Sequence, residues 1–93
     1  MIQNSITGHI GKTPVTRLTG FLAPHAADIF IKMEGFNPGG SVKDRPALNM
    51  ILEAERSGQL RPNGTLVEST SGNLGPALAM IAAARGYRCV IVV

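Results

Sequence analysis

One lysine of this sequence stands where a helix is predicted to begin, directly after a glycine-rich turn. In the stretch EGFNPGGSVKDRPA, residues 34–47, Lys43 follows an Asn-Pro-Gly-Gly turn and Ser41. Ser41 can cap the helix with Asp44 as a short form of the capping box, or Asp44 can itself be the cap, because Pro46 is tolerated only in the first turn. Either choice leaves Lys43 within about one residue of the helix start, where the positive helix end favours the neutral amine. Such an amine could attack an aldehyde, although an isolated lysine is more often a solvated surface residue.

A second loop, STSGNLGPA at residues 69–77, gathers hydroxyl, amide and glycine residues at the start of another predicted helix. The residues that could bind a ligand there are Thr70, Ser71, Gly72 and Asn73. Free backbone N–H groups and the positive helix end suit a carboxylate or a phosphate, and the hydroxyls and the amide add directed hydrogen bonds. The alternative is an ordinary strand-to-helix turn, capped by Ser71 or Asn73 with Pro76 in the first turn. The loop alone does not decide between the two.

Both loops fall short of nucleotide-binding motifs. Gly35 and Gly40 have the spacing of a P-loop, but the next residue is Ser41, where a P-loop requires lysine. Gly72 and Gly75 supply only the last half of a dinucleotide-binding fingerprint. A nucleotide site of either kind is therefore excluded.

The elements that must position these loops alternate between strand and helix. Apolar, β-rich runs predict strands at residues 29–33, 65–69 and 89–93, and helical spacing of apolar residues predicts helices at 42–57 and 74–85. Gly58 and Gly86 are the expected C-terminal caps. The pattern predicts an α/β fold built from one βαβαβ unit, with right-handed crossovers and a parallel sheet covered on both faces.

Composition excludes several classes of function. The nine basic residues, against six acidic ones, are scattered singly along the chain rather than clustered, which argues against nucleic-acid binding. Cys89 is the only cysteine and is expected to be a buried structural thiol, and two distant histidines give no metal site. The longest apolar run, residues 77–84, is far shorter than the roughly 20 residues that cross a bilayer. We expect a cytoplasmic protein without a membrane partner.

The end of the chain suggests that more protein follows. Val93 lies in an apolar strand, and ligands of open α/β sheets bind beyond the carboxyl ends of the strands. We therefore expect residues 1–93 to be the N-terminal segment of a larger protein.

Three stretches together carry a family resemblance. GKTPVTRL, IKMEGFNPGGSVKDR and ESTSGNLGPALA begin at Gly11, Ile31 and Glu68, and in this order they resemble the cysteine synthase family of pyridoxal 5'-phosphate enzymes, which have the tryptophan-synthase β fold. The resemblance spans almost the whole chain. It implies the N-terminal part of a fold-type II enzyme that works as a homodimer of two-domain subunits.

The resemblance also assigns roles to the two loops. It implies that Lys43 is the Schiff-base lysine and general base, and that Asn73 hydrogen-bonds the ring hydroxyl of the cofactor. It further implies that the substrate α-carboxylate is held by Thr70, Ser71 and Gly72. In the family the phosphate-binding loop and the partner of the pyridine nitrogen lie beyond Val93, so we expect the 93-residue segment alone to be inactive. Gly39, Gly40 and Arg45 could serve the site or only the turn and a surface ion pair, and we favour the structural roles.

The implied reaction is β-replacement on an activated serine. Cysteine synthases commonly have proline before the TSGN motif and a hydroxyl residue after it, whereas this chain has Ser69 and Leu74. ESTSGNLG is similar to the siderophore-pathway branch, in which O-phosphoserine and glutamate give N-(2-amino-2-carboxyethyl)-L-glutamate, a precursor of 2,3-diaminopropionate. The alternatives are cysteine synthesis from O-acetylserine and sulfide or, in another class, a non-catalytic α/β anion-binding module or incomplete subunit.

Overall fold

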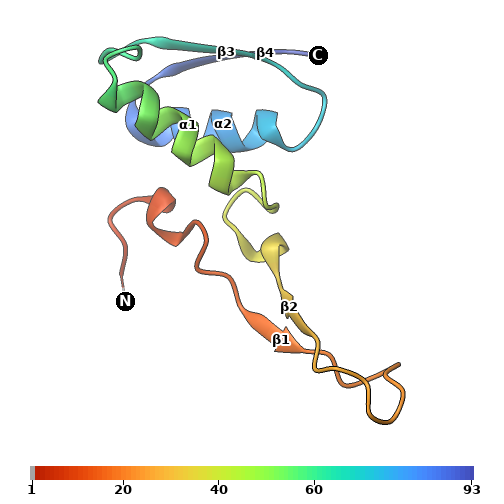
Figure 1. Ribbon diagram of the computed structural model, residues 1–93. Coiled ribbons are helices and arrows are strands. Elements are labelled where there is room, and N and C mark those ends of the chain that lie inside the picture. Colours follow the sequence, from red (N-terminus) through yellow and green to blue (C-terminus); the bar gives the residue numbers. More distant parts are fainter. Residues whose placement is uncertain (1) are drawn as a thin grey trace.

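The structure is a computed structural model that describes residues 2–93, with an α/β body from which a hairpin projects (Figure 1). In chain order the elements are the 3-10 helix η1 (Ile6–His9), the strands β1 (Val15–Arg17) and β2 (Phe30–Lys32), the 3-10 helix η2 (Glu34–Phe36), α1 (Asp44–Arg56), β3 (Thr65–Ser69), α2 (Leu74–Arg85) and β4 (Arg88–Val92). The predicted α/β class is confirmed, and β3 and α2 have the predicted bounds.

Glycines end both α-helices, as the sequence predicts. Gly86 has a φ of +81°, and its N–H donates to the carbonyl of Ala82. Gly58 has a φ of +80°, and its N–H donates to the carbonyl of Glu55 at 3.2 Å. Because only glycine takes this left-handed conformation without a steric cost, each glycine fixes the place where its helix stops.

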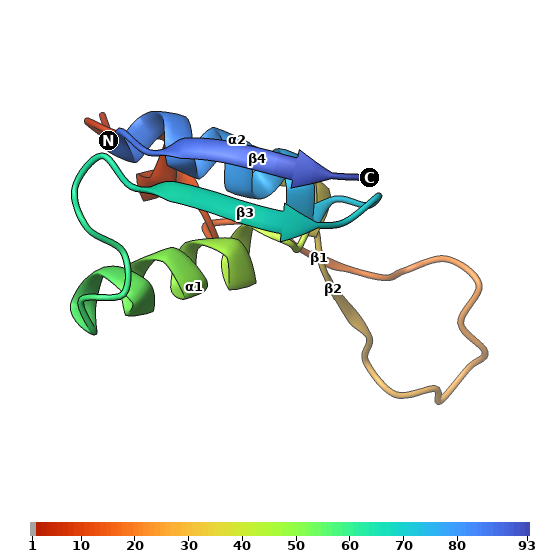
Figure 2. The same cartoon turned by 90° about the horizontal axis from the view of Figure 1, so that it is seen from above.

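The body is a parallel pair of strands with both α-helices on one face (Figure 2). In β3 and β4, Thr65 lies opposite Arg88 and Ser69 opposite Val92. α2 connects the strands and packs against both of them, and α1 packs against α2. The buried apolar residues are Ala47, Ile51, Leu60, Ala77, Leu78, Ile81 and Ala82. Three of these seven residues are alanines, and the other four are leucine or isoleucine.

The prediction that residues 29–33 form the first strand of the parallel sheet is wrong. β2 instead pairs antiparallel with β1 in a separate sheet, with Val15 opposite Lys32. A backbone bond from Met33 N to Pro14 O, 2.9 Å long, extends the pair. The segment pairs with its neighbour in the chain because closing a short loop costs less entropy than a long one. A strand of only three paired residues is too short for its sequence to indicate which other strand it pairs with.

The β1–β2 hairpin lies away from the body (Figure 1). The radius of gyration is 16.7 Å and the longest dimension is 55 Å, whereas a compact chain of this length has a radius of gyration of about 12 Å. All residues of β1 and β2 are exposed, so the hairpin adds nothing to the core.

Only one face of the parallel sheet is covered by the described residues. Val67, Val90 and Val92 are 67%, 49% and 51% exposed, whereas Cys89 and Ile91 pack against the core. The expected cover on both faces is therefore absent within residues 2–93, because both α-helices lie on the same side. Cys89 is half-buried, and this burial raises the pKa of its thiol. No helix among residues 2–93 combines the length and the apolar character needed to cross a bilayer.

Candidate active site

Lys43 lies at the end of the loop that leads from η2 into α1, one residue before the helix begins at Asp44. The residue is exposed, and its backbone N–H donates to Ser41 Oγ at 3.2 Å. Neither predicted cap is correct, because Lys43 itself occupies the N-cap position of α1 without a side-chain capping bond, Ser41 binds only the N–H of Lys43, and Asp44 is the first helical residue. The predicted position of Lys43 at the positive end of α1 is confirmed.

The turn before Lys43 is shaped around a buried carboxylate. Asp44 is fully buried, and its Oδ2 accepts a hydrogen bond from the Gly39 N–H at 2.6 Å. A Cβ on Gly39 would lie 2.2 Å from Asp44 Oδ1, so a larger residue there would displace the carboxylate. Gly40 has a φ of +85°, which disfavours any side chain. Both glycines thus have the structural role that the sequence predicts.

The second loop leaves several donors available at the start of α2. Thr70 Oγ1 accepts a hydrogen bond from the Gly72 N–H at 3.1 Å, which folds the loop back on itself. Asn73 occupies the N-cap position, but its side chain makes no capping hydrogen bond. Within residues 2–93, the backbone N–H groups of Ser71 and Asn73 have no hydrogen-bond acceptor either. The Asn73 amide and two backbone donors are therefore free for a ligand, which disfavours the alternative of an ordinary capped turn.

The two loops lie at the same end of the body. Figures 1 and 2 both place the N-terminal ends of α1 and α2 beside the carboxyl ends of β3 and β4. Because the strands are parallel and the helices run back against them, this arrangement follows from the chain topology. It directs the positive ends of two helices toward one side of the molecule. The amine of Lys43 and the donors of the second loop thus belong to one region.

A cavity of about 340 Å³ opens at the second loop. Its lining residues come from this loop, from α2 and from the end of β4, and they are Thr70, Ser71, Gly72, Gly75, Pro76, Ala79, Ile91 and Val93. A Cβ on Gly75 would lie 3.3 Å from methyl carbons of Ile91 and Thr70, so a glycine keeps the loop close to β4. Lys43 and Asn73 are in the same region, but they do not line this cavity.

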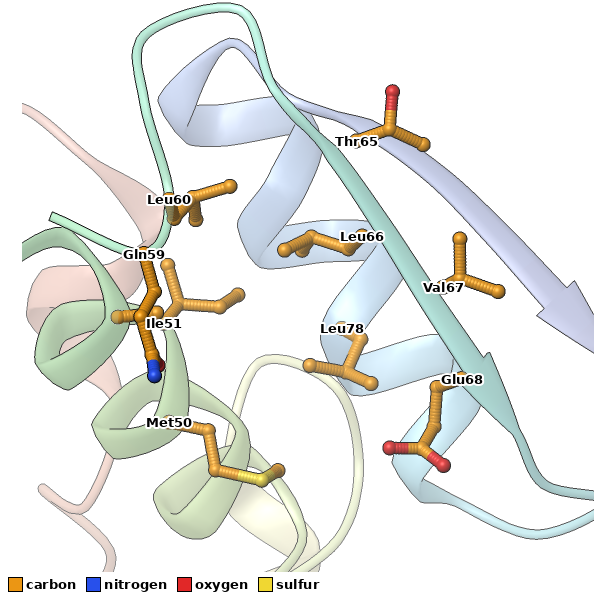
Figure 3. A pocket seen from close by; sticks show the side chains of 10 residues that line it. Met50, Ile51, Gln59, Leu60, Thr65, Leu66, Val67, Glu68 and Leu78 are labelled. Atoms are coloured by element: carbon orange, nitrogen blue, oxygen red, sulfur yellow. The ribbon is translucent and has the colours of Figure 1, made fainter.

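A larger cavity, of about 460 Å³, lies between α1 and β3 and is not the candidate site (Figure 3). Its walls are formed mainly by apolar side chains such as Met50, Leu66 and Leu78, and Glu68 is its one ionisable residue. It contains no residue of either loop. It therefore offers an apolar surface beside the exposed edge of β3 rather than reactive groups.

Sequence reasoning missed a carboxylate that holds the lysine loop. Glu34, in η2, receives hydrogen bonds from Arg45 Nε at 2.7 Å and Nη2 at 2.9 Å. It also receives bonds from Thr13 and Asn37, each 2.9 Å long. The Arg45 guanidinium, acting first through its hydrogen bonds, lowers the pKa of Glu34 to about 2. The sequence predicts that Arg45 forms an ion pair, but it does not identify Glu34 as the partner. The two residues are eleven apart in the chain, and no local spacing links them.

Comparison with known proteins assigns the chain to a family. Residues 6–93 match a family described as "Pyridoxal-phosphate dependent enzyme". The chain belongs to this family. An O-ureido-L-serine synthase of Streptomyces lavendulae is 58% identical over 96% of this chain and 27% of its own length. Cysteine synthase B of Salmonella typhimurium is 51% identical over 92% of this chain and 28% of its own length. The predicted resemblance to the cysteine synthase family is thereby confirmed.

Solved structures of the family have the same fold as this chain. The crystal structure of O-ureido-L-serine synthase matches with a TM-score of 0.88 at 56% identity, over 98% of this chain and 28% of that one. The O-acetylserine-dependent cystathionine beta-synthase from Helicobacter pylori matches with a TM-score of 0.90 at 38% identity, over 100% of this chain and 31% of that one. These neighbours are fold-type II enzymes, so this part of the fold prediction is confirmed. The chain spans somewhat over a quarter of the length of the relatives that it matches.

The donors of the site fit the family's cofactor, pyridoxal 5'-phosphate. An aldehyde requires an exposed amine, which Lys43 provides at the start of α1. An oxygen on the cofactor ring requires a donor without a partner, and the Asn73 amide is such a group. The described residues thus match the part of the cofactor that carries the reactive aldehyde.

Proposed function

We propose that the complete protein containing this chain catalyses pyridoxal-phosphate-dependent β-replacement on an activated serine. The observation that supports it is the pair of loops at one end of the body, one with an exposed lysine and the other with unpaired donors. Relatives named cysteine synthase and O-ureido-L-serine synthase support the same reaction class. In this proposal residues 1–93 form the N-terminal segment of a longer, homodimeric enzyme.

Each loop has a separate task in this reaction. Lys43 attaches the cofactor through Nζ and, when released, takes the α-proton of the substrate as general base. The cofactor, when bound, supplies an electron sink for the pair left by that proton. Asn73 donates its amide to the ring hydroxyl. The substrate α-carboxylate accepts hydrogen bonds from Thr70, Ser71 and Gly72, and this fixes which bond to the α-carbon faces Lys43.

The substrates form the finer part of the proposal. Leu74 and Ser69 flank the second loop and favour O-phosphoserine with an amino-acid nucleophile, as in the synthesis of the diaminopropionate precursor. A second candidate, the formation of O-ureido-L-serine, follows from the name of the relative at 58% identity, O-ureido-L-serine synthase. A third is sulfide with O-acetylserine, which the cysteine synthases support. All three reactions replace a leaving group on the β-carbon of a serine derivative, and they differ in the identity of the leaving group or of the nucleophile.

The role of Lys43 can be tested by chemical trapping in the complete protein. Borohydride reduction in the presence of the cofactor should give a stable adduct, which peptide mapping assigns to Lys43. Lys43→Ala should lose the adduct and all turnover while its far-UV circular dichroism stays unchanged. Lys12→Ala, which removes another exposed lysine, is the matched control and should keep both. A folded Lys43→Ala protein with normal turnover would refute the role of Lys43. An unchanged complete protein that gives neither adduct nor turnover would instead favour the non-catalytic anion-binding module.

The substrate can be tested by rapid mixing and product analysis. O-phosphoserine should change the absorbance of the bound cofactor faster than O-acetylserine does. The enzyme that has reacted with the serine ester is then mixed with glutamate, hydroxyurea or sulfide, and the product is identified by mass spectrometry. The reverse order of the two serine esters would exclude the preferred leaving group, and the product mass would select the nucleophile.

A further inference from the structure

The loop that carries Lys43 is fastened at both ends to one carboxylate. Asn37, at the start of the loop, donates from Nδ2 to Glu34 Oε2 at 2.9 Å. Arg45, just after the lysine, donates from Nε to the same Oε2 at 2.7 Å and from Nη2 to Oε1 at 2.9 Å. Glu34 therefore connects residues on the two sides of Lys43, and it does so through short, charge-assisted bonds.

Asn37 adds a second set of bonds inside the loop. The residue is only 4% exposed. Its Nδ2 also donates to the carbonyl of Ser41 at 3.0 Å, and its Oδ1 accepts from the Gly11 N–H at 2.8 Å. The Gly40 N–H donates to the carbonyl of Asn37 at 2.8 Å. The backbone up to two residues before Lys43 is thus held by one buried amide.

The same carboxylate joins the loop to the N-terminal segment. Thr13 Oγ1 donates to Glu34 Oε1 at 2.9 Å, and Arg45 Nη2 donates to the carbonyl of Gly11 at 2.9 Å. Gly11 has a φ of +81°, and a Cβ on it would lie 2.8 Å from Arg45 Nη1. The N-terminal segment therefore follows the guanidinium closely. The hydrogen bonds from Arg45 lower the pKa of Glu34 to about 2, so the carboxylate that joins these segments stays ionised well below neutral pH.

We propose that Glu34 is a positioning residue for Lys43, which holds both ends of the lysine loop in one arrangement and thereby presents the amine to the cofactor aldehyde. This inference rests on the proposed role of Lys43. Glu34 itself touches neither cofactor nor substrate, and it acts through Arg45 and Asn37. A displacement of the amine by about 1 Å is enough to slow a reaction roughly 100-fold.

Glu34→Gln tests the proposal with almost no change in shape. Both carboxylate oxygens accept hydrogen bonds from Arg45, one from Nε and the other from Nη2. Whichever way a glutamine amide is turned, its NH₂ group faces an N–H of Arg45. The substitution therefore replaces an attraction by a contact between two donors and separates the two ends of the loop.

The matched control is Glu55→Gln, at the other end of α1. Glu55 also pairs with one arginine through two bonds, from Arg85 Nε at 3.0 Å and Nη2 at 2.6 Å, and it accepts a further bond from the Tyr87 hydroxyl. The side chains of Glu34 and Glu55 are 20% and 23% exposed. The two variants thus lose similar interactions, but only one of them lies beside Lys43.

The readout is the rate at which the complete, cofactor-free protein forms the borohydride-trapped adduct on Lys43. Glu34→Gln should slow attachment about 10- to 100-fold, and Glu55→Gln should change it less than about twofold. Arg45→Lys, which keeps the charge and loses the two-pronged geometry, should fall between them. Equal rates for Glu34→Gln and the unchanged protein would overturn the proposal. Absence of an adduct in the unchanged protein would instead overturn the proposed function.

Hydrogen–deuterium exchange keeps the proposal testable without the cofactor. In the cofactor-free protein, Glu34→Gln should speed exchange of the Gly39 and Gly40 amides, which donate inside the loop, while amides of α2 keep their protection. Unchanged protection at Gly39 and Gly40 would show that the loop does not depend on Glu34. If Glu34→Gln fails to fold, the same two measurements on Arg45→Lys decide the outcome.

Discussion

Replacing Gly39 by alanine should destabilise the protein because the new methyl group meets a buried carboxylate. The Cβ would lie 2.2 Å from Asp44 Oδ1 and 2.9 Å from its Cγ. Since non-bonded contacts begin at about 3.4 Å, the carboxylate must retreat by about 1 Å. Asp44 is fully buried, and its movement would also break the 2.6 Å hydrogen bond from the Gly39 N–H. Overpacking and the lost bond together should cost about 2–4 kcal/mol.

The assay is thermal unfolding of the complete, cofactor-free protein, so that ligand binding does not shift the midpoint. At about 2–4 °C per kcal/mol for a domain of 150–250 residues, Gly39→Ala should lower the midpoint by about 4–16 °C. Gly35→Ala is the control, because a Cβ there meets no atom within 4 Å. The free energy of unfolding of the control variant should stay within about 0.5 kcal/mol of that of the unchanged protein.

A double substitution separates the steric effect from a backbone effect. If the contact with Asp44 causes the loss, Gly39→Ala should cost little in a protein that already carries Asp44→Ala, so the two changes should not be additive. A midpoint for Gly39→Ala equal to that of Gly35→Ala would refute the reasoning. Full additivity in the double variant would show that the clash is not the cause.

Three further predictions concern other parts of the body. Ile81→Ala removes a fully buried side chain from α2 and should cost about 2–5 kcal/mol in urea unfolding, whereas a loss below about 1 kcal/mol would mean that the core there is loose. Gly86→Ala should cost about 1–2 kcal/mol in the same assay, because φ is +81°, and no cost would contradict the left-handed cap. The stability that the ionised Glu34 contributes is complete above pH 4.5 and should be lost as the pH falls toward about 2. The difference in the free energy of unfolding between the unchanged protein and Glu34→Gln should therefore become smaller over that pH range. A difference that stays constant would contradict the lowered pKa.

Some of the site could be read from the chain because its elements are specified locally. The loop at residues 69–77 follows a strand and precedes a helix whose bounds the structure confirms. The turn residues and Pro46 alone predict that Lys43 stands at a helix start, and the structure places it there. Caps, turns and helical periods depend on neighbours within about four residues, so one sequence contains the information.

The partners of the lysine loop could not be read in the same way. Glu34 joins Arg45, eleven residues on, and Thr13, twenty-one residues back, and only the folded chain brings them together. The buried Asp44 was predicted to serve the cap, but it accepts from Gly39 and constrains the turn. Such contacts depend on tertiary packing, which a single sequence does not encode by spacing.

The sequence alone is enough to predict the α/β class, strands at residues 65–69 and 89–93, which the structure pairs in parallel as β3 and β4, and the motifs that identify the family. Only the tertiary structure decided that β2 joins β1 in a separate hairpin, and that both helices cover one face of the sheet. The physical reason is the range of the interactions. Hydrogen bonding and side-chain periodicity within one element are local, whereas the choice of partner strand and covered face is made by the burial of apolar surface across the whole fold.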